Sequence, residues 1–338
     1  MTSMTHAPLR RRVCVSWFIS IALVVLVTAP AVAQTGAGAS GTEVTAEFLR
    51  GPTGMGGIRL IDEEPDFAGV DVEYRLSGSP QNTVARVLSG EVDIAALPSN
   101  VAAKVYNAGA PYQLAVVHTL GVLYLVSRDD EVSDWSDLPG REIGNIGRGA
   151  NPDIIFRYLL RQNGLDPDGD VDLRFYNHTE LAQLVIAGRR EVAVLPEPFV
   201  TRVLTAAPEA EVAIDFQEEW RKIKGADAEI GMGALVVKKS LVESNPDFVR
   251  SFLRAYRESI RFVNEEPTAA GELIEKHQLG FTADNAASAI PRANIVFRPA
   301  PEARRALEEY LQVLLDFDPA SIGGSLPDDG FYLDRALP

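Results

Sequence analysis

Two stretches of this chain carry nearly the same pattern of residues: VLSGEVDIAALP at Val87–Pro98 and VIAGRREVAVLP at Val185–Pro196. Each predicts the end of an amphipathic helix, a glycine that stops it, a short apolar strand and a Leu-Pro turn, after which a helix restarts. A unit used twice, 98 positions apart, predicts two similar α/β lobes rather than one barrel or a short-period solenoid. Ligands of open α/β sheets bind outside the carboxyl ends of the strands, so we expect a cleft between the lobes.

The rest of the chain alternates between strand-like and helix-like patterns. Cap residues followed by proline at Ser79-Pro80, Asn151-Pro152 and Asn245-Pro246 are typical of helix starts, and we expect Ser99 to cap another helix. A helical C-terminal third is expected from residue 245 onward. Apolar runs predict strands at 44–49, 70–76, 92–97, 114–117, 121–127, 142–146, 171–176 and 233–238.

This alternation predicts how the chain divides between the lobes. We expect residues 44–127 in lobe 1, 128–230 in lobe 2, and 231–338 as a strand that returns to lobe 1 with the C-terminal helices. The chain then crosses between the lobes twice, near 126–130 and 231–237. Two crossings make a two-strand hinge that lets the lobes close on a ligand.

The N-terminus has the pattern of an export signal. Arg10–Arg12 precede an apolar run at 13–27, and Ala31–Ala33 supply a small-residue cleavage site. We expect residues 1–33 to be a signal peptide cleaved after Ala33, with 34–43 as a flexible leader; an uncleaved N-terminal anchor is the alternative. Cys14, the single cysteine, lies inside this signal, so an extracytoplasmic mature chain without disulfides is predicted.

Charge and motifs argue against several classes of function. The net charge is −15, and −18 without residues 1–33, which hold three arginines and no acidic residue. So acidic a chain is a poor partner for nucleic acid or anionic membranes. The histidines form no H-E-x-x-H motif, and no G-x-S-x-G elbow occurs. We therefore expect no catalytic residues, no metal and no cofactor, and not an enzyme.

Four motifs, the first of them inside the first repeat, resemble one family in their order and spacing. They are SGEVDIA at 89–95, WSDLPGR at 135–141, LRQNGLD at 160–166 and NPDFVRSFLRAY at 245–256. The chain is similar to extracytoplasmic solute-binding proteins of bacterial ABC importers, of the nitrate/sulfonate/taurine and thiamine-precursor class. The resemblance implies the two-lobed periplasmic-binding-protein fold of type II, with one small molecule held between the lobes.

The resemblance also implies partners and leaves alternatives open. A monomer would deliver its solute to an ABC permease with its ATPase. The alternatives are a sensing module that presents its bound form to a membrane receptor, and a biosynthetic enzyme of the thiamine-precursor or menaquinone type on the same fold. The solute stays undecided among sulfonates, nitrate, pyrimidines, flavins and aromatic or carboxylated compounds.

Candidate ligand-binding residues lie in the loops that follow the predicted strands. The glycine-rich loop 51–57 lets backbone approach a ligand, and the helix after it offers free N–H groups. Arg148 and Asn151 start a lobe 2 helix, where an anion would be favoured, whereas Glu197 suits a cationic or hydrogen-bond-donating group. The predicted set is Thr53, Gly54, Met55, Gly56, Ser99, Asn100, His118, Thr119, Arg148, Asn151 and Glu197.

Overall fold

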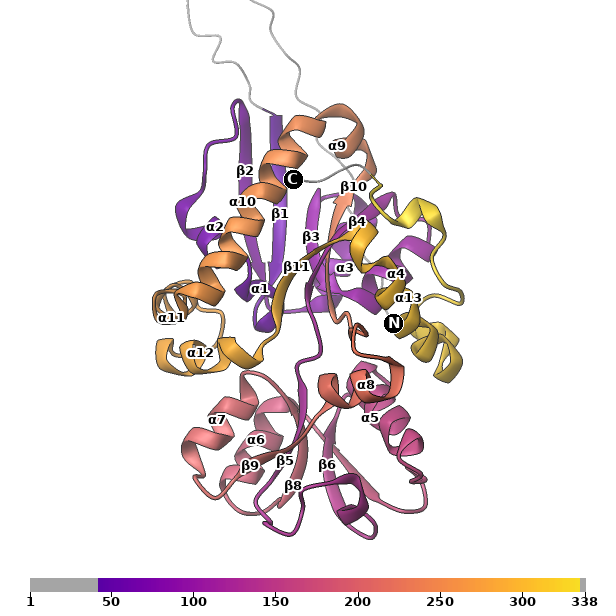
Figure 1. Ribbon diagram of the computed structural model, residues 1–338. Coiled ribbons are helices and arrows are strands. Elements are labelled where there is room, and N and C mark those ends of the chain that lie inside the picture. The colour runs from indigo at the N-terminus through magenta and orange to yellow at the C-terminus, as the bar shows by residue number, and fades with distance from the viewer. Residues whose placement is uncertain (1–41, 335–338) are drawn as a thin grey trace, which may run out of the picture. The chain divides into compact units, whose positions relative to one another are not determined.

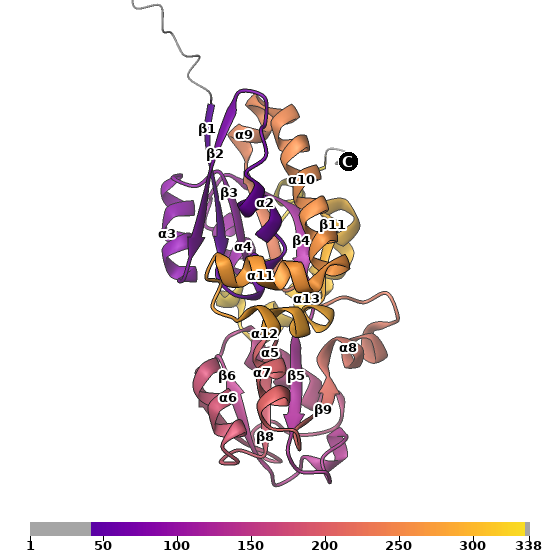
Figure 2. The same cartoon turned by 90° about the vertical axis from the view of Figure 1, so that its left-hand side faces the viewer.

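The computed structural model describes residues 42–334, which form two lobes that are each built on one sheet (Figures 1 and 2). The expected signal peptide, residues 1–33, lies outside the described residues. The first strand begins at Thr42, so the last two residues of the expected leader 34–43 belong to a strand.

Lobe 1 holds a six-stranded sheet with the strand order β11-β4-β10-β3-β1-β2. Its strands are β1 (Thr42–Leu49), β2 (Val70–Ser77), β3 (Ile94–Pro98), β4 (Tyr112–Thr119), β10 (Gly233–Lys238) and β11 (Ile295–Pro299). Its helices are α1 (Pro52–Met55), α2 (Ile58–Glu63), α3 (Pro80–Ser89), α4 (Ser99–Asn107), α9 (Lys239–Ser244), α10 (Pro246–Glu265), α11 (Pro267–Lys276), α12 (Ala283–Ala289) and α13 (Ala300–Phe317), with short 3-10 turns η2 (Ile290–Arg292), η3 (Pro319–Ser321) and η4 (Asp329–Phe331).

Lobe 2 holds a five-stranded sheet with the strand order β7-β6-β8-β5-β9. Its strands are β5 (Leu123–Ser127), β6 (Glu142–Ile146), β7 (Asp172–Tyr176), β8 (Val192–Pro196) and β9 (Glu211–Asp215). Its helices are α5 (Asn151–Gln162), α6 (His178–Ile186), α7 (Phe199–Ala206) and α8 (Phe216–Lys224), with the 3-10 turn η1 (Trp135–Asp137).

The repeated sequence unit occupies the same place in both lobes. Its strand is β3 in lobe 1 and β8 in lobe 2, and each follows a glycine in the left-handed conformation, Gly90 with φ 78° and Gly188 with φ 66°. Each strand runs parallel to one neighbour, β1 or β6, and antiparallel to the other, β10 or β5. The prediction of two similar α/β lobes is confirmed.

The antiparallel neighbours place both repeat turns at the junction of the lobes. Pro98, at the end of β3, lies opposite Gly233, the first residue of β10 after one crossing. Pro196, at the end of β8, lies opposite Leu123, the first residue of β5 after the other crossing. The loops that follow β3 and β8 therefore start beside the crossing segments.

The structure corrects the expected boundary between lobe 1 and lobe 2 at residue 127. β5, which spans 123–127, pairs with β8 and β9 in the lobe 2 sheet. The first crossing is therefore the segment 120–122 and not 126–130, and the second is 225–232, just before β10. Buried strands of both lobes have similar apolar sequences, so the sequence of β5 could not show which sheet it joins.

Helices cover both faces of the lobe 1 sheet, as the colours of Figure 1 show. On β1, Val44, Ala46 and Phe48 face the core under α10, which also holds Phe252 and Tyr256. The opposite face is covered by α3, α4 and α13. The alternation along β1 turns Glu47 toward α3, where a charged residue needs partners.

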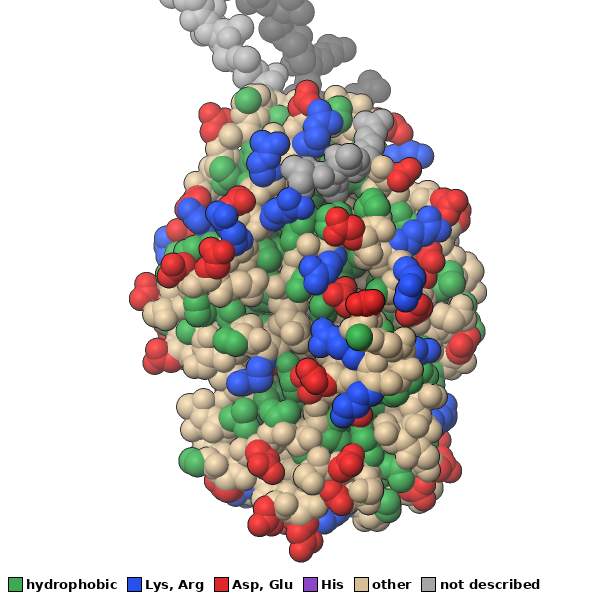
Figure 3. Space-filling model, viewed as in Figure 1, with side chains coloured by type: hydrophobic (Ala, Val, Ile, Leu, Met, Phe, Trp, Pro, Cys, Tyr) green, Lys and Arg blue, Asp and Glu red, His purple; other side chains and the backbone are tan. Residues whose placement is uncertain are grey.

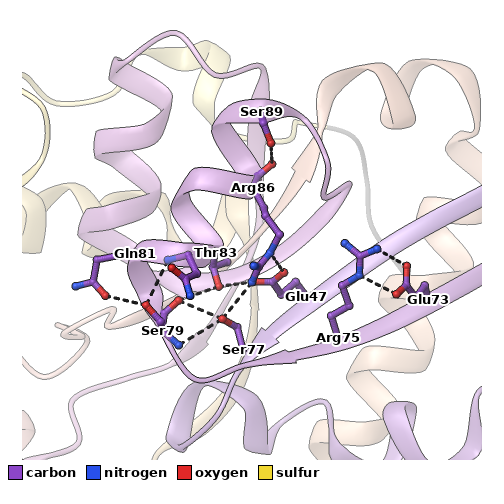
Figure 4. A network of polar contacts seen from close by, with 10 residues as sticks. Glu47, Glu73, Arg75, Ser77, Ser79, Gln81, Thr83, Arg86 and Ser89 are labelled. Carbon is purple, nitrogen blue, oxygen red and sulfur yellow. Dashed lines mark hydrogen bonds and ion pairs between the residues drawn. The ribbon is translucent and has the colours of Figure 1, made fainter.

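Glu47 is fully buried and finds those partners on α3 (Figure 4). Arg86 donates from Nε to Oε2 and from Nη2 to Oε1, both at 2.7 Å, and the Thr83 hydroxyl donates to Oε1 as well. Ser79 caps α3 by accepting from the Asn82 amide. This network fixes α3 against the carboxyl end of β1.

Removing Arg86 tests that network, and Arg75 on β2 supplies the control. Arg86→Met leaves the buried carboxylate of Glu47 without its cation, so we expect the free energy of unfolding to fall. The fall should be about 2–3 kcal/mol, smaller than for a fully buried pair, because the Arg86 side chain is partly exposed. Arg75→Met breaks only the exposed pair with Glu73 and should change stability by less than about 0.5 kcal/mol. Urea unfolding of both variants measures this, and equal losses would contradict it.

Candidate functional site

One buried side chain at the junction of the lobes, Gln217 at the start of α8, bonds both crossing segments. Its Oε1 accepts from the amides of Gly121 at 3.3 Å and Ile230 at 2.9 Å, which belong to different crossing segments. Its Nε2 donates to the Ala228 carbonyl at 3.0 Å. The two crossing segments are thus tied to each other and to lobe 2.

Ser99 bonds the second crossing segment and does not cap a helix. It is the first residue of α4, and its hydroxyl donates to the carbonyl of Gly231 in the second crossing segment. Its amide donates to the Met232 carbonyl at 2.9 Å. The expected cap is therefore wrong, because this side chain satisfies a crossing segment instead.

Two predicted site residues from different lobes are in contact. Asn151, at the start of α5 in lobe 2, donates from Nδ2 to Oδ1 of Asn100 in α4 of lobe 1 at 2.9 Å. Asn100 in turn donates to the Ser321 carbonyl at 3.3 Å. The Oδ1 of Asn151 is buried and has no hydrogen-bond partner. An unpaired buried acceptor is costly, so this atom is suited to a donor from a bound molecule.

The loop between β6 and α5 carries an exposed cation, Arg148. Arg148 is exposed and stacks over the ring of Phe175 on β7, 4.3 Å from its centroid. Part of the anion-binding capacity of this loop is used by the chain itself, because Asp153 accepts from the Gly149 amide at 2.9 Å. Asn151 does not cap α5 through its side chain, contrary to expectation, because that side chain reaches Asn100.

The glycine-rich segment 51–57 is not the expected loop, because it contains the short helix α1, and its glycines are explained by the protein's own packing. A Cβ on Gly54 would overlap the Leu49 carbonyl, and one on Gly56 would lie 3.0 Å from Ile260 and 3.3 Å from the Tyr256 hydroxyl. Met55 is buried in the lobe 1 core. Close packing within lobe 1 therefore explains the presence of Gly54, Met55 and Gly56, and the sequence alone does not show this. Thr53 keeps a partly exposed side chain.

His118 and Thr119 end β4 in a buried position. His118 Nδ1 lies 2.9 Å from Thr119 Oγ1, whereas Nε2 has no hydrogen-bond partner. The ring packs edge-on against Tyr256, whose buried hydroxyl also lacks a partner. Burial lowers the pKa of His118 to about 4, because the charged ring would lose its hydration.

This pKa predicts a specific loss of stability in acid. The unfolded chain takes up a proton near pH 6.5 and the folded one only near pH 4, so His118 destabilises the fold as pH falls between those values, by about 3 kcal/mol. His118→Gln removes the titration. We expect the difference in free energy of unfolding between pH 6.5 and 4 to be smaller in the variant. Parallel curves for variant and parent would contradict this.

Glu197, at the end of the second repeat, is fully buried and engaged by the chain. Its Oε2 accepts from the Thr201 amide and its Oε1 from the Thr201 hydroxyl, both at 3.0 Å. Arg292, which ends η2 in lobe 1, donates to Oε1 at 2.6 Å. Burial raises the pKa of Glu197, against the opposing effect of Arg292.

Sequence reasoning missed Gln217, Arg292 and Tyr256. No motif marks Gln217, because β9 and α8 were not predicted. The turn η2 and strand β11 fell inside the expected helical C-terminal third. Tyr256 lies on the apolar face of α10, where an aromatic residue is ordinary core.

Other features lie apart from this site. A groove of about 530 Å³ separates α13 from α5 and α8, and none of its lining residues is a predicted site residue. Within residues 42–334, no cluster of three or more His, Cys, Asp or Glu side chains could hold a metal. No helix in the described part of the chain is both long and apolar enough to cross a membrane.

Comparisons with known proteins agree with the two-lobed architecture. Residues 66–270 match the model of the NMT1/THI5-like family, and the chain belongs to that family. A crystal structure of an ABC transporter from Parabacteroides distasonis is similar, with a TM-score of 0.76 and 26% identity, over 87% of this chain and 100% of that one.

Two further solved structures share the fold at lower identity. The periplasmic aliphatic sulphonate binding protein SsuA from Escherichia coli matches with a TM-score of 0.63 and 13% identity, over 80% of this chain and 92% of that one. The periplasmic nitrate-binding protein NrtA from Synechocystis PCC 6803 matches with a TM-score of 0.57 and 14% identity, over 83% and 81%. The predicted periplasmic-binding-protein fold is therefore confirmed.

One curated relative matches this chain over little more than half of either protein. YtlA of Bacillus subtilis (strain 168) is 24% identical over 200 residues, which span 58% of this chain and 58% of that protein.

Proposed function

We propose that this protein captures one small solute between its lobes outside the cytoplasmic membrane and delivers it to an ABC permease powered by an ATPase. The observation that carries the proposal is the contact between Asn100 and Asn151, because it joins the first turns of α4 in lobe 1 and α5 in lobe 2 beside an unpaired buried acceptor. The family and the similar structures support the same reading.

The mechanism follows from the two crossing segments. A solute that touches both lobes gains its full contacts only when they are closed, so binding shifts the population toward the closed form. The permease can then distinguish loaded from empty protein by shape. We propose that the chain works as a monomer and binds one solute without changing it chemically.

The contacts proposed for the solute come from the predicted set. We propose that Asn100, Asn151 and Thr53 offer hydrogen bonds, that the exposed Arg148 offers a cation, and that His118 and Thr119, buried at the end of β4, also contact the solute. Ser99 and Glu197 are used mainly by the chain itself. This combination favours a small organic solute with hydrogen-bond donors and an anionic group over a bare inorganic ion.

The surface fits this role better than nucleic-acid binding. Figure 3 shows acidic and basic side chains scattered over the face in view rather than gathered into a basic patch.

A sensing role would use the same bound form, and a receptor gene in place of permease genes beside this one would favour it. Export by a cleaved signal peptide belongs to the same proposal.

A thermal-shift screen of the purified protein tests the capture of a solute. The panel contains taurine, methanesulfonate, nitrate, a thiamine-precursor pyrimidine, riboflavin and benzoate. A compound at a hundredfold excess over its Kd should add about 2.7 kcal/mol of apparent stability. Steady conversion of a bound compound into product would contradict the binding role and favour an enzyme.

A substitution at Asn151 tests the proposed site most directly, and one at Asn163, at the other end of α5, is its control. Asn151→Ala removes the contact with Asn100 of the other lobe, and we expect at least a tenfold weaker Kd, equivalent to about 1.4 kcal/mol, for the compound that binds the parent. Asn163→Ala loses only a bond to the Leu159 carbonyl and should bind as the parent does. Titration calorimetry measures both, and equal affinities would remove Asn151 from the site.

A further inference from the structure

One side chain of lobe 1 holds two groups of lobe 2. Arg292 donates from Nε to Oε1 of Glu197 and from Nη2 to Oγ1 of Thr201, both at 2.6 Å. Arg292 lies in η2, whereas Glu197 precedes α7 and Thr201 lies in its first turn. A planar guanidinium that engages a carboxylate and a hydroxyl together fixes their relative orientation.

The chain around Arg292 makes further contacts with lobe 2 and the first crossing segment. The hydroxyl of Tyr124, on β5, donates to the Arg292 carbonyl at 2.7 Å, and the side-chain amide of Asn294 donates to the Gly121 carbonyl. Phe281, just before α12, packs edge-on against Phe199 of α7 with ring centroids 5.8 Å apart. Figure 2 shows α12 and α7 facing each other between the lobes.

The burial of Glu197 makes this contact sensitive to separation of the lobes. Its side chain has no exposed surface while Arg292 lies against it. A carboxylate buried without its cation is costly, whereas a hydrated one is not. If Arg292 were absent and the lobes stayed in contact, Glu197 would be a buried, unpaired charge, and separating the lobes would relieve this by admitting water.

We propose that Arg292 is a positioning residue that holds the lobes together through Glu197 and Thr201 with no solute required. Both partners belong to the chain, so the pair forms by itself and sets how much of the unloaded protein is closed. This inference rests on the proposed function only in taking the lobes to move about the crossing segments. Glu197 then acts in closure and is not a solute contact.

Distances between the lobes in the absence of any solute test this directly. Spin labels go on cysteines at Leu88→Cys in α3 and Gln183→Cys in α6, both exposed, in the full chain carrying Cys14→Ser. In Arg292→Gln we expect the pulsed-EPR distance distribution to shift, with the ratio of separated to closed molecules at least ten times that of the parent. Arg305→Gln, which loses only an exposed pair with Glu309, should match the parent.

A second variant guards against simple misfolding. Thr201→Val removes one acceptor of Arg292 but keeps both charges, so it should shift the same ratio in the same direction by a smaller factor. Circular dichroism and cooperative unfolding show whether each variant is folded. If folded Arg292→Gln and Thr201→Val both give the parent's distribution, the pair does not hold the lobes and the proposal is wrong. The solute screen is independent of this result.

Discussion

The amide of Gln217 bonds both segments that cross between the lobes, and the geometry of the candidate site depends on that constraint. It satisfies the amides of Gly121 and Ile230 with one oxygen, deep inside the junction. The approach is close, because a Cβ on Gly121 would lie 3.0 Å from Gln217. A side chain buried at this point fixes where β5 and β10 begin, and their first residues lie opposite the turns of the repeat.

From this junction the site follows by symmetry of the two lobes. Each repeat strand ends at the junction, so the helices after them start there, with Asn100 on one side and Glu197 on the other. The lobes meet through different chemistry at these places. Asn100 and Asn151 share a neutral hydrogen bond beside an unpaired oxygen, whereas Glu197 and Arg292 form a charged pair in which Glu197 is buried. The first place has capacity left for a solute, and the second contributes to closure.

The sequence predicted the lobes well because the repeat is a local pattern with a clear period. It placed Asn100 and Asn151 among the candidate ligand contacts, through the rule that ligands bind at strand ends, but it did not predict that the two side chains meet. It could not predict that Arg292 pairs with Glu197, because 95 positions separate them and no local pattern records the contact. The glycines of 51–57 show the same limit. Their number indicated close approach, but only the structure shows that Leu49, Ile260 and Tyr256 are what they approach.

Hydrogen exchange with and without a bound compound tests the central claim that the solute lies between the lobes. The compound is the one from the thermal-shift panel that raises Tm most. The account predicts slower exchange at 99–103 in lobe 1 and at 147–153 in lobe 2 together, with the crossing segments 120–122 and 225–232 also protected. Protection confined to one lobe, or to the groove between α13 and α8, would contradict it.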